Sequence, residues 1–178
     1  MAFLAQLDDG TIDNANSHVT VQEYYNYTTD RGYDYTDLTD YPTLKIQAAA
    51  IKATDYINNQ FRYVSIQVNE DQGTAFPRDY VYDLAANQIE AIPVPVKQDT
   101  YELMRYLLDN PSEELYDDID AESAGVKSYK DSISSGLFDE KEYFGSVKYN
   151  SKVIGLASNI KRCGYLIASG SSEGSLYI

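Results

Sequence analysis

The chain contains no tryptophan, one cysteine (Cys163) and one histidine (His18). A single cysteine cannot form an internal disulfide, so folding does not require an oxidising compartment. His18 has no cysteine or second histidine near it in the sequence, which leaves a zinc ion without a ligand set. A serine hydrolase would need His18 as its base, and no Gly-x-Ser-x-Gly motif is present to carry the nucleophile. We therefore assign no catalytic, metal-binding or cofactor-binding residue.

Ligand-binding loops are also missing from the sequence. The glycines are too scattered for a phosphate-binding loop, and no Gly-Lys-Ser/Thr follows any of them. A calcium loop beginning at Asp118 would place Ser123 and Tyr129 where a glycine and a bidentate acid are required. We interpret the acidic run 117–122 as a solvated loop. The 28 acidic residues offer too many carboxylate pairs to single one out for acid–base chemistry, and we predict that the protein is not an enzyme.

Long apolar runs are absent as well. No window approaches the roughly 18 apolar residues that a membrane-spanning helix needs. The first nine residues have neither a positively charged region nor a long apolar core, so we expect no signal peptide and no membrane association. The 178 residues, of which 43% are hydrophobic, are enough for one folded domain.

The formal net charge is −14, and it is unevenly distributed. Residues 1–44 carry −7 and residues 99–123 carry −8, whereas 45–98 carry −1 and 124–178 carry +2. Binding to the nucleic-acid backbone requires clustered Lys and Arg, which this sequence does not have. The acidic blocks are compatible with a solvated surface or with complementary patches that join copies head to tail in a ring.

The 18 tyrosines are an unusual feature of what is present. Tyrosine combines a flat apolar ring with a polar tip, which suits half-buried positions and subunit interfaces. The sequence leaves open whether these residues form the core or an interface.

Two further residues have simple interpretations: we expect Cys163 to be a small buried hydrophobic residue, and Arg78 to be either a buried ion-pair partner or an exposed residue.

The hydrophobic pattern predicts about four helices. The first begins at Thr20, because Thr20–Glu23 has the sequence of a capping box, and it ends near Arg31 and Gly32. Val19 and Tyr24 occupy the positions of a hydrophobic staple around this cap. The second begins near Pro42 and presents one apolar stripe. The stripe consists of Ile46, Ala50, Ala53 and Ile57.

Two more helices are predicted toward the C-terminus. Pro93 and Pro95 are expected to fix an extended geometry before the third helix, which ends at Pro111. Its stripe consists of Val96, Thr100, Leu103 and Leu107. The last helix begins near Ser151 and has Gly164 as its C-cap. Its apolar face consists of Val153, Leu156, Ala157 and Ile160.

The remaining segments predict a small amount of β-structure. Residues 61–92 are mostly irregular, although 63–68 alternate as a strand would. Two strands at 126–130 and 144–149 are expected to form a β-hairpin near 125–149. The predicted fold is mostly α, a small helical bundle of about four helices with a β-hairpin insertion and extended terminal arms. We expect residues 1–18 to form an N-terminal arm, 19–164 the helical domain, and 165–178 a C-terminal tail.

Five segments carry a family resemblance because they occur in a familiar order and spacing. They are Thr20–Tyr25, Ala48–Ile57, Ala75–Arg78, Ile92–Lys97 and Gly125–Ser128. Together they resemble the head–tail connector proteins of tailed bacteriophages, also called adaptor or head-completion proteins. Many members of that family carry the label of a DnaT-like single-stranded-DNA-binding protein. This chain departs from the pattern in lacking a glycine-rich loop at 61–75, in a long insert at 131–143, and in the tail beyond Gly164.

The resemblance implies a structural protein of the virion, assembled in the host cytoplasm. Such proteins form a ring, usually a dodecamer, below the portal protein and present a surface to the next neck or tail protein. The genomic DNA would pass through the channel without specific binding, which an acidic lumen would favour. The arm at 1–18 or the tail at 165–178 would become ordered on docking.

Two alternatives remain at the level of the sequence. One is a single-stranded-DNA-binding replication protein, for which stacking aromatic residues are plentiful but a basic groove is missing. These aromatic residues are Tyr24, Tyr25, Tyr27, Tyr33 and Tyr35. The other is a different neck or tail-completion component, which the sequence barely distinguishes from an adaptor.

Overall fold

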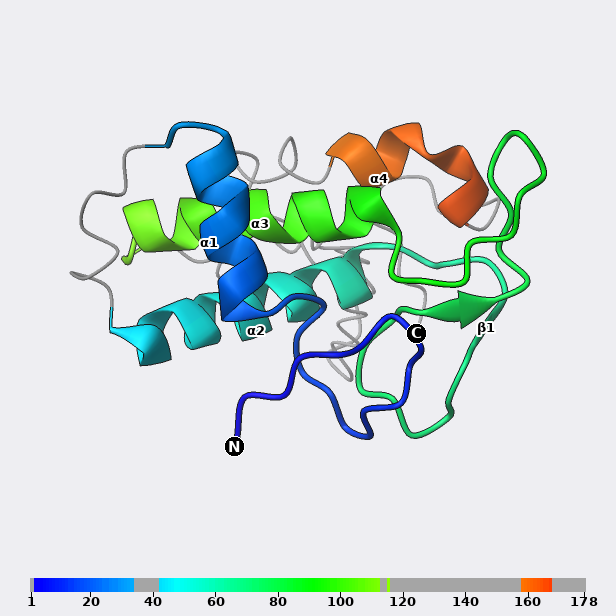
Figure 1. The fold of residues 1–178 in the computed structure, drawn as a ribbon, viewed down its shortest axis with the longest axis horizontal. Coiled ribbons are helices and arrows are strands. Elements are labelled where there is room, and N and C mark those ends of the chain that lie inside the picture. The colour runs from blue at the N-terminus through cyan, green and yellow to red at the C-terminus, as the bar shows by residue number, and fades with distance from the viewer. Residues whose placement is uncertain (1, 34–41, 113–114, 116–157, 168–178) are drawn as a thin grey trace, which may run out of the picture.

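The computed structural model describes residues 2–33, 42–112, 115 and 158–167. Within these residues the chain is mostly helical, with one small antiparallel sheet (Figure 1). The elements are α1 (Val21–Asp30), α2 (Thr43–Gln60), β1 (Ile66–Gln67), β2 (Arg78–Asp79), α3 (Val94–Asp109), α4 (Ser158–Arg162) and the 3-10 helix η2 (Gly164–Leu166). The predicted class of a small helical bundle with a two-stranded β-element is thus confirmed.

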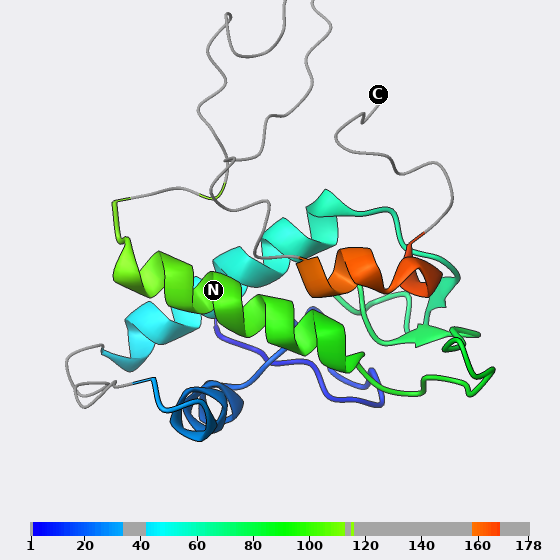
Figure 2. The same cartoon turned by 90° about the horizontal axis from the view of Figure 1, so that it is seen from above.

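The core lies between α2 and α3. These helices run in opposite directions and cross each other at an angle, α1 lies across them, and α4 packs on α3 (Figures 1 and 2). All four residues of the predicted α2 stripe are fully buried: Ile46, Ala50, Ala53 and Ile57. The α3 stripe is buried as well, with Val96, Thr100 and Leu103 at 0% exposure and Leu107 at 8%. Small alanines on α2 let the two backbones approach closely, so the apolar side chains of α3 fill the space between them.

The start of α1 is as predicted. The Thr20 hydroxyl accepts a hydrogen bond from the Glu23 amide at 3.1 Å, and the Glu23 carboxylate accepts one from the Thr20 amide at 2.7 Å. Val19 and Tyr24, the staple residues, are both fully buried. Gly32 has a φ of +62°, which glycine adopts without steric cost after the end of the helix.

The third helix starts earlier than predicted. Pro93 is its N-cap and Pro95 lies inside its first turn, not before the helix. Proline is tolerated there because the amide groups of the first turn have no partner within the helix. The helix ends at Asp109, one residue before the cap Asn110 and two before Pro111, as the sequence indicated.

The strand expected at residues 63–68 is shorter than predicted. Only Ile66 and Gln67 form β1, which pairs with Asp79 and Arg78 of β2. Ser65 before β1 has a φ of +68°, and Tyr80 after β2 has a φ of +56°. A left-handed residue turns the backbone out of the extended conformation, so each strand is limited to two residues.

Residues 2–18, expected as an extended arm, have no helix but lie against the domain. Ala15, Ser17 and His18 are buried, at 1%, 0% and 0% exposure. The Asn14 amide donates to the Asp71 carbonyl at 2.9 Å. A Cβ on Gly73 would lie 2.3 Å from the Ala15 carbonyl oxygen, so this close approach requires glycine. The segment is therefore an integral part of the fold in this structure, not a free arm.

The packed part of the chain also extends beyond the predicted boundary at Gly164. Gly164 is not a helix C-cap, because it begins η2. Leu166, which we placed in the C-terminal tail, is fully buried, and its carbonyl accepts from the Val64 amide at 3.1 Å. Ile167 forms a bridge with Tyr63. The segment 158–167 thus closes over α3 and the chain that follows α2.

Several predictions concern residues outside the described part. They are the strands at 126–130 and 144–149, the hairpin region 125–149, the acidic run 117–122, residues 151–157 of the last predicted helix, and the tail from 168 onward. No helix among the described residues combines the length and hydropathy needed to cross a membrane.

Candidate functional site

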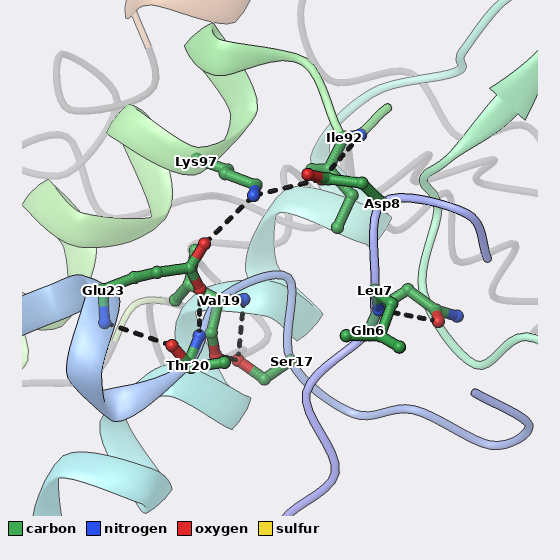
Figure 3. A network of polar contacts seen from close by, with 9 residues as sticks. All are labelled: Gln6, Leu7, Asp8, Ser17, Val19, Thr20, Glu23, Ile92 and Lys97. Atoms are coloured by element: carbon green, nitrogen blue, oxygen red, sulfur yellow. Dashed lines mark hydrogen bonds and ion pairs between the residues drawn. The ribbon is translucent and has the colours of Figure 1, made fainter. Parts of the chain in front are cut away.

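A polar clasp joins the N-terminal segment, α1 and α3 (Figure 3). The Lys97 ammonium group lies 3.1 Å from the Asp8 carboxylate and 3.1 Å from the Glu23 carboxylate. Asp8 also accepts from the Ile92 amide at 3.3 Å, just before α3 begins. Glu23 uses its other oxygen for the α1 capping box with Thr20. One lysine therefore connects a helix cap to the N-terminal segment.

The position of Lys97 keeps it charged. Burial by itself lowers the pKa of a lysine, but the hydrogen bonds and the negative charges of Glu23 and Asp8 outweigh burial and raise the pKa of Lys97. The Lys97 side chain is 20% exposed. With two carboxylates bound to it, this ammonium group is not available for a phosphate.

A second cluster joins α1 to α3 through tyrosines. The hydroxyl groups of Tyr27 and Tyr33 donate to one oxygen of Glu102, at 2.8 and 3.3 Å. The guanidinium of Arg105 binds the other oxygen of Glu102 at 2.8 Å and lies over the Tyr33 ring, 4.6 Å from its centre. Burial, followed by the hydrogen bond to Glu102, raises the pKa of Tyr27 well above its usual value. This cluster is a set of internal contacts.

The tyrosine rings that the sequence offered for base stacking are used in packing. The Tyr27 ring lies 4.4 Å from the Tyr101 ring and beneath the Arg31 guanidinium, which is 3.7 Å from its centre. Tyr24 is fully buried, and Tyr25 packs against the core. Tyr35 lies outside the described residues. Within α1, these tyrosines pack in the core and in the α1–α3 contact, which is the first of the two roles that the sequence left open.

Arg78 follows neither interpretation offered by the sequence. Its Nε donates to the Val64 carbonyl at 2.7 Å, its Nη1 donates to the Ala75 carbonyl at 3.1 Å, and its Nη2 donates to the Ser65 carbonyl. The side chain therefore fastens the turn after the cis peptide between Phe76 and Pro77 to the strand-forming segment. Among the described residues it makes no ion pair.

The single histidine is buried among apolar groups. His18 is 0% exposed, its ring meets Phe76 edge to face at 6.3 Å, and no described residue forms a hydrogen bond with either ring nitrogen. Burial, with a smaller contribution from the charge of Lys97, lowers its pKa to about 3. His18 is thus neutral at physiological pH and is placed as a core residue, with no acidic or cysteine partner.

Asp99 is a buried carboxylate with a raised pKa, and the sequence analysis did not single it out. It lies on the buried face of α3 at 0% exposure and accepts from the Ile160 amide at 2.9 Å and the Asn159 side chain at 2.7 Å. Burial raises its pKa to about 6, although these hydrogen bonds act in the opposite direction. Its role in the structure is to hold the first turn of α4 against α3. Cys163, at the end of α4, is free and half-buried, less enclosed than we predicted.

The end of the molecule that carries the sheet is apolar and acidic on its surface. A shallow depression of about 730 Å³ is lined by residues 65–70 and Arg78. The exposed apolar residues there are Ile66, Val68, Tyr80, Tyr82 and Leu84. Within 63–96 the acidic residues are Glu70, Asp71, Asp79, Asp83 and Glu90, and Arg78 is the one base. Because acids outnumber bases five to one in this stretch, the surface favours a basic or apolar partner over an anionic one.

The described residues do not assemble a metal site: no group of three or more His, Cys, Asp or Glu side chains among them is arranged to hold an ion. Nine lysines and arginines lie in the described part. Arg78, Lys97 and Arg105 are each bound to groups of the same chain. The other six lie just after α1, in the N-terminal part of α2, just after α2, and in α4.

Comparison with known protein families identifies a family for this chain. Residues 5–141 match the family described as "Putative DnaT-like ssDNA binding protein". The match spans α1, α2, the sheet and α3 and covers most of the chain, so this protein belongs to that family. No curated protein and no solved structure matches the chain.

Proposed function

We propose that this protein is a structural component of a tailed-phage virion, a head-to-tail adaptor that forms a ring below the portal and connects the DNA-filled head to the neck or tail. The proposal rests on the resemblance of five ordered segments to that class of protein. Four of them fall on described residues, at the start of α1, along α2, at the Arg78 turn and at the start of α3. In each place the residues have a structural role, which is to cap a helix, pack helices closely, fasten a turn or begin a helix.

One observation favours this proposal over single-stranded-DNA binding: the tyrosines around α1, and the cations Lys97 and Arg105, contact other groups of the same chain. Binding of single-stranded DNA combines stacking on exposed aromatic rings with a positively charged groove. Here Tyr24 is buried, Tyr27 stacks within the protein, and Tyr33 binds Glu102. With a net charge of −14, the chain as a whole would repel a DNA strand at long range.

A second candidate function is single-stranded-DNA binding in replication, because the description of the matching family names that activity. For this function the positive surface would have to come from the C-terminal third, residues 124–178, which carries a net charge of +2. Exposed stacking rings are present at Tyr80 and Tyr82, at 66% and 47% exposure. Those rings lie beside Asp79 and Asp83, which weakens the case for a phosphate track.

The two functions are separated by titrating a fluorescent single-stranded oligonucleotide with the full chain at low salt, about 20 mM, where phosphate contacts are strongest. The adaptor proposal predicts no binding below about 100 μM protein. A Kd near or below 1 μM that weakens steeply with added salt would favour the replication function. A variant with Tyr80→Ser and Tyr82→Ser tests whether any binding observed depends on the exposed rings.

A further inference from the structure

The loop between β2 and α3 presents a leucine to solvent on a preformed tip. Leu84 is 92% exposed, and the rings of Tyr80 and Tyr82 beside it are 66% and 47% exposed. An isolated exposed leucine is common on protein surfaces. Leu84 together with Tyr80 and Tyr82, however, forms an exposed apolar patch that is suited to a protein contact.

The backbone beneath Leu84 is held in one conformation by Asp83. One oxygen of its carboxylate accepts from the amides of Ala85 and Asn87 at 2.8 and 2.9 Å, and the other accepts from the Asn87 side chain at 3.1 Å. Below the tip, the Ile89 amide donates to the Val81 carbonyl at 2.8 Å. A tip that is already ordered loses little conformational entropy on binding, which favours recognition by a partner.

The charge around this tip indicates what the partner must offer. Residues 78–90 carry three acids, Asp79, Asp83 and Glu90, against one base, Arg78, so the loop and its base are net negative. A matching surface would therefore combine lysines or arginines with apolar or small side chains.

The chain itself carries such a surface on the outer face of α2. Lys45, Ala48 and Lys52 are exposed and follow one another at spacings of three and four residues, which places them on one face of the helix. Leu44 beside them is 76% exposed. The first acidic residue of α2 is Asp55, so the N-terminal two-thirds of this helix is basic.

These two surfaces lie at opposite ends of the molecule. In Figure 1 the N-terminal end of α2 lies at one end of the longest axis, and the loop that precedes α3 lies at the other. Different surfaces at opposite ends produce a heterologous, head-to-tail contact, which can repeat from copy to copy and close into a ring.

We propose that neighbouring copies of this chain join through these surfaces, with the 80–90 loop of one copy bound to the Leu44, Lys45, Ala48 and Lys52 face of α2 on the next. This inference rests on the proposed ring-forming function and specifies the contact that builds the ring. Leu84 contacts the small residue Ala48 and its apolar neighbour, and the acids around the loop lie opposite the two lysines.

The experiment uses two variants of the full chain, Leu84→Ser and the double variant Lys45→Glu/Lys52→Glu. All three positions are exposed, so the fold is expected to persist. Sedimentation velocity from about 1 μM to about 1 mM covers a thousandfold range of Kd. The wild-type chain is expected to self-associate, more weakly as salt is added, and each variant is expected to raise the self-association Kd at least about tenfold.

Mixing the two variants provides the decisive result. Each variant retains one intact surface, so a 1:1 mixture is expected to form heterodimers that grow no further. Matched controls are Leu4→Ser for the apolar change and Arg62→Glu/Arg162→Glu for the charge reversal, and both should assemble as the wild type does. The inference is overturned if the wild type stays monomeric throughout, if the mixture forms no heterodimer, or if the controls weaken assembly equally.

These outcomes can be told apart from failure of the adaptor function. If the wild type assembles and the variants behave like it, another surface joins the copies and the ring proposal stands without this contact. If Leu84→Ser weakens attachment to purified portal protein but leaves self-association unchanged, the loop binds a different protein and the inference is wrong. Tight DNA binding in the oligonucleotide titration would instead contradict the adaptor function itself.

Discussion

The response of this fold to pH depends on individual buried side chains, above all His18 and Asp99. The folded pKa of His18 is about 3, below its unfolded value of 6.5. The unfolded chain therefore binds a proton that the folded chain does not, and stability falls as the pH drops from 6.5 toward 3. The folded pKa of Asp99 is about 6, above its unfolded value of 3.8. Its contribution has the opposite sign, and stability rises as the pH drops from 6 to 3.8.

Replacing His18 with leucine is expected to flatten the acid side of the stability profile. The substitution removes a proton linkage of at most about 1.4 kcal/mol per pH unit and leaves no unpaired ring nitrogen in the core. Urea unfolding at pH 7, 6, 5 and 4 measures the slope for both proteins. An unchanged slope below pH 6.5 would show that His18 is protonated in the folded state or is not buried.

Removing the Asp99 carboxylate is expected to loosen the C-terminal segment. Asp99→Ala leaves the Ile160 amide and the Asn159 side chain without their acceptor, which costs about 1–3 kcal/mol when such groups stay buried. Hydrogen exchange should rise mainly in residues 158–167. The control Asp55→Ala changes an exposed acid on α2 and should alter stability by less than about 0.5 kcal/mol. Equal effects of the two substitutions would argue against a specific contact with α4.

At the scale of elements, short-range patterns predicted α1, α2 and α3 well, and long-range polar contacts escaped prediction. The capping box at Thr20 and the apolar stripe of α2 depend on residues close in sequence, so they can be read directly. The contacts of Lys97 with Asp8 and Glu23 join residues far apart in the chain, and no local pattern announces them. The carbonyl contacts of Arg78 could have been suspected only from its place next to a Phe-Pro turn.

The cap of α1 gives an element-scale prediction. Thr20→Ala removes the hydroxyl that accepts from the Glu23 amide and is expected to cost about 1 kcal/mol in the free energy of unfolding. Thr29→Ala, at the exposed end of the same helix, is the matched control and should cost less than about 0.5 kcal/mol. Urea unfolding at neutral pH measures both. A loss for Thr29→Ala as large as that for Thr20→Ala would contradict the capping account.

The contacts of Lys97 with Asp8 and Glu23 give a second prediction at the scale of elements. Lys97→Met keeps the aliphatic stem but releases Asp8 and Glu23, both of which are partly exposed, so the loss of stability should be only about 1 kcal/mol. The more specific readout is hydrogen exchange, which should increase in residues 2–18. Lys45→Met on the exposed face of α2 should leave that segment unchanged. Protection of residues 2–18 that survives Lys97→Met would show that their buried apolar contacts are sufficient.

At the scale of the whole molecule, the tyrosines around α1 and two of the basic side chains are used in the same way, in contacts within the chain. The chain uses its aromatic residues around α1 to join helices, and it pairs Lys97 and Arg105 with its own acids. Among the residues that the structure describes, one end has an acidic surface with exposed apolar residues and the other end has a basic helix face. Under the adaptor proposal, these surfaces serve contacts with proteins, including copies of the chain, rather than contacts with phosphate groups.

The sequence could predict this class of fold but not the residues at which the packed domain begins and ends. The buried ends at Ala15 and Leu166 lie in segments without a helical pattern, so nothing local indicated that they pack on the core. The predicted hairpin near 125–149 lies outside the described residues, whereas the observed sheet has strands of only two residues, too short for alternation to reveal.

The most direct test of the adaptor proposal is the copy number of this polypeptide in purified tailed particles, measured by quantitative mass spectrometry against the portal protein. The account predicts that the polypeptide is retained in finished virions in a fixed ratio close to one copy per portal subunit. Its absence from finished particles, together with recovery from infected cells on single-stranded DNA, would contradict the account.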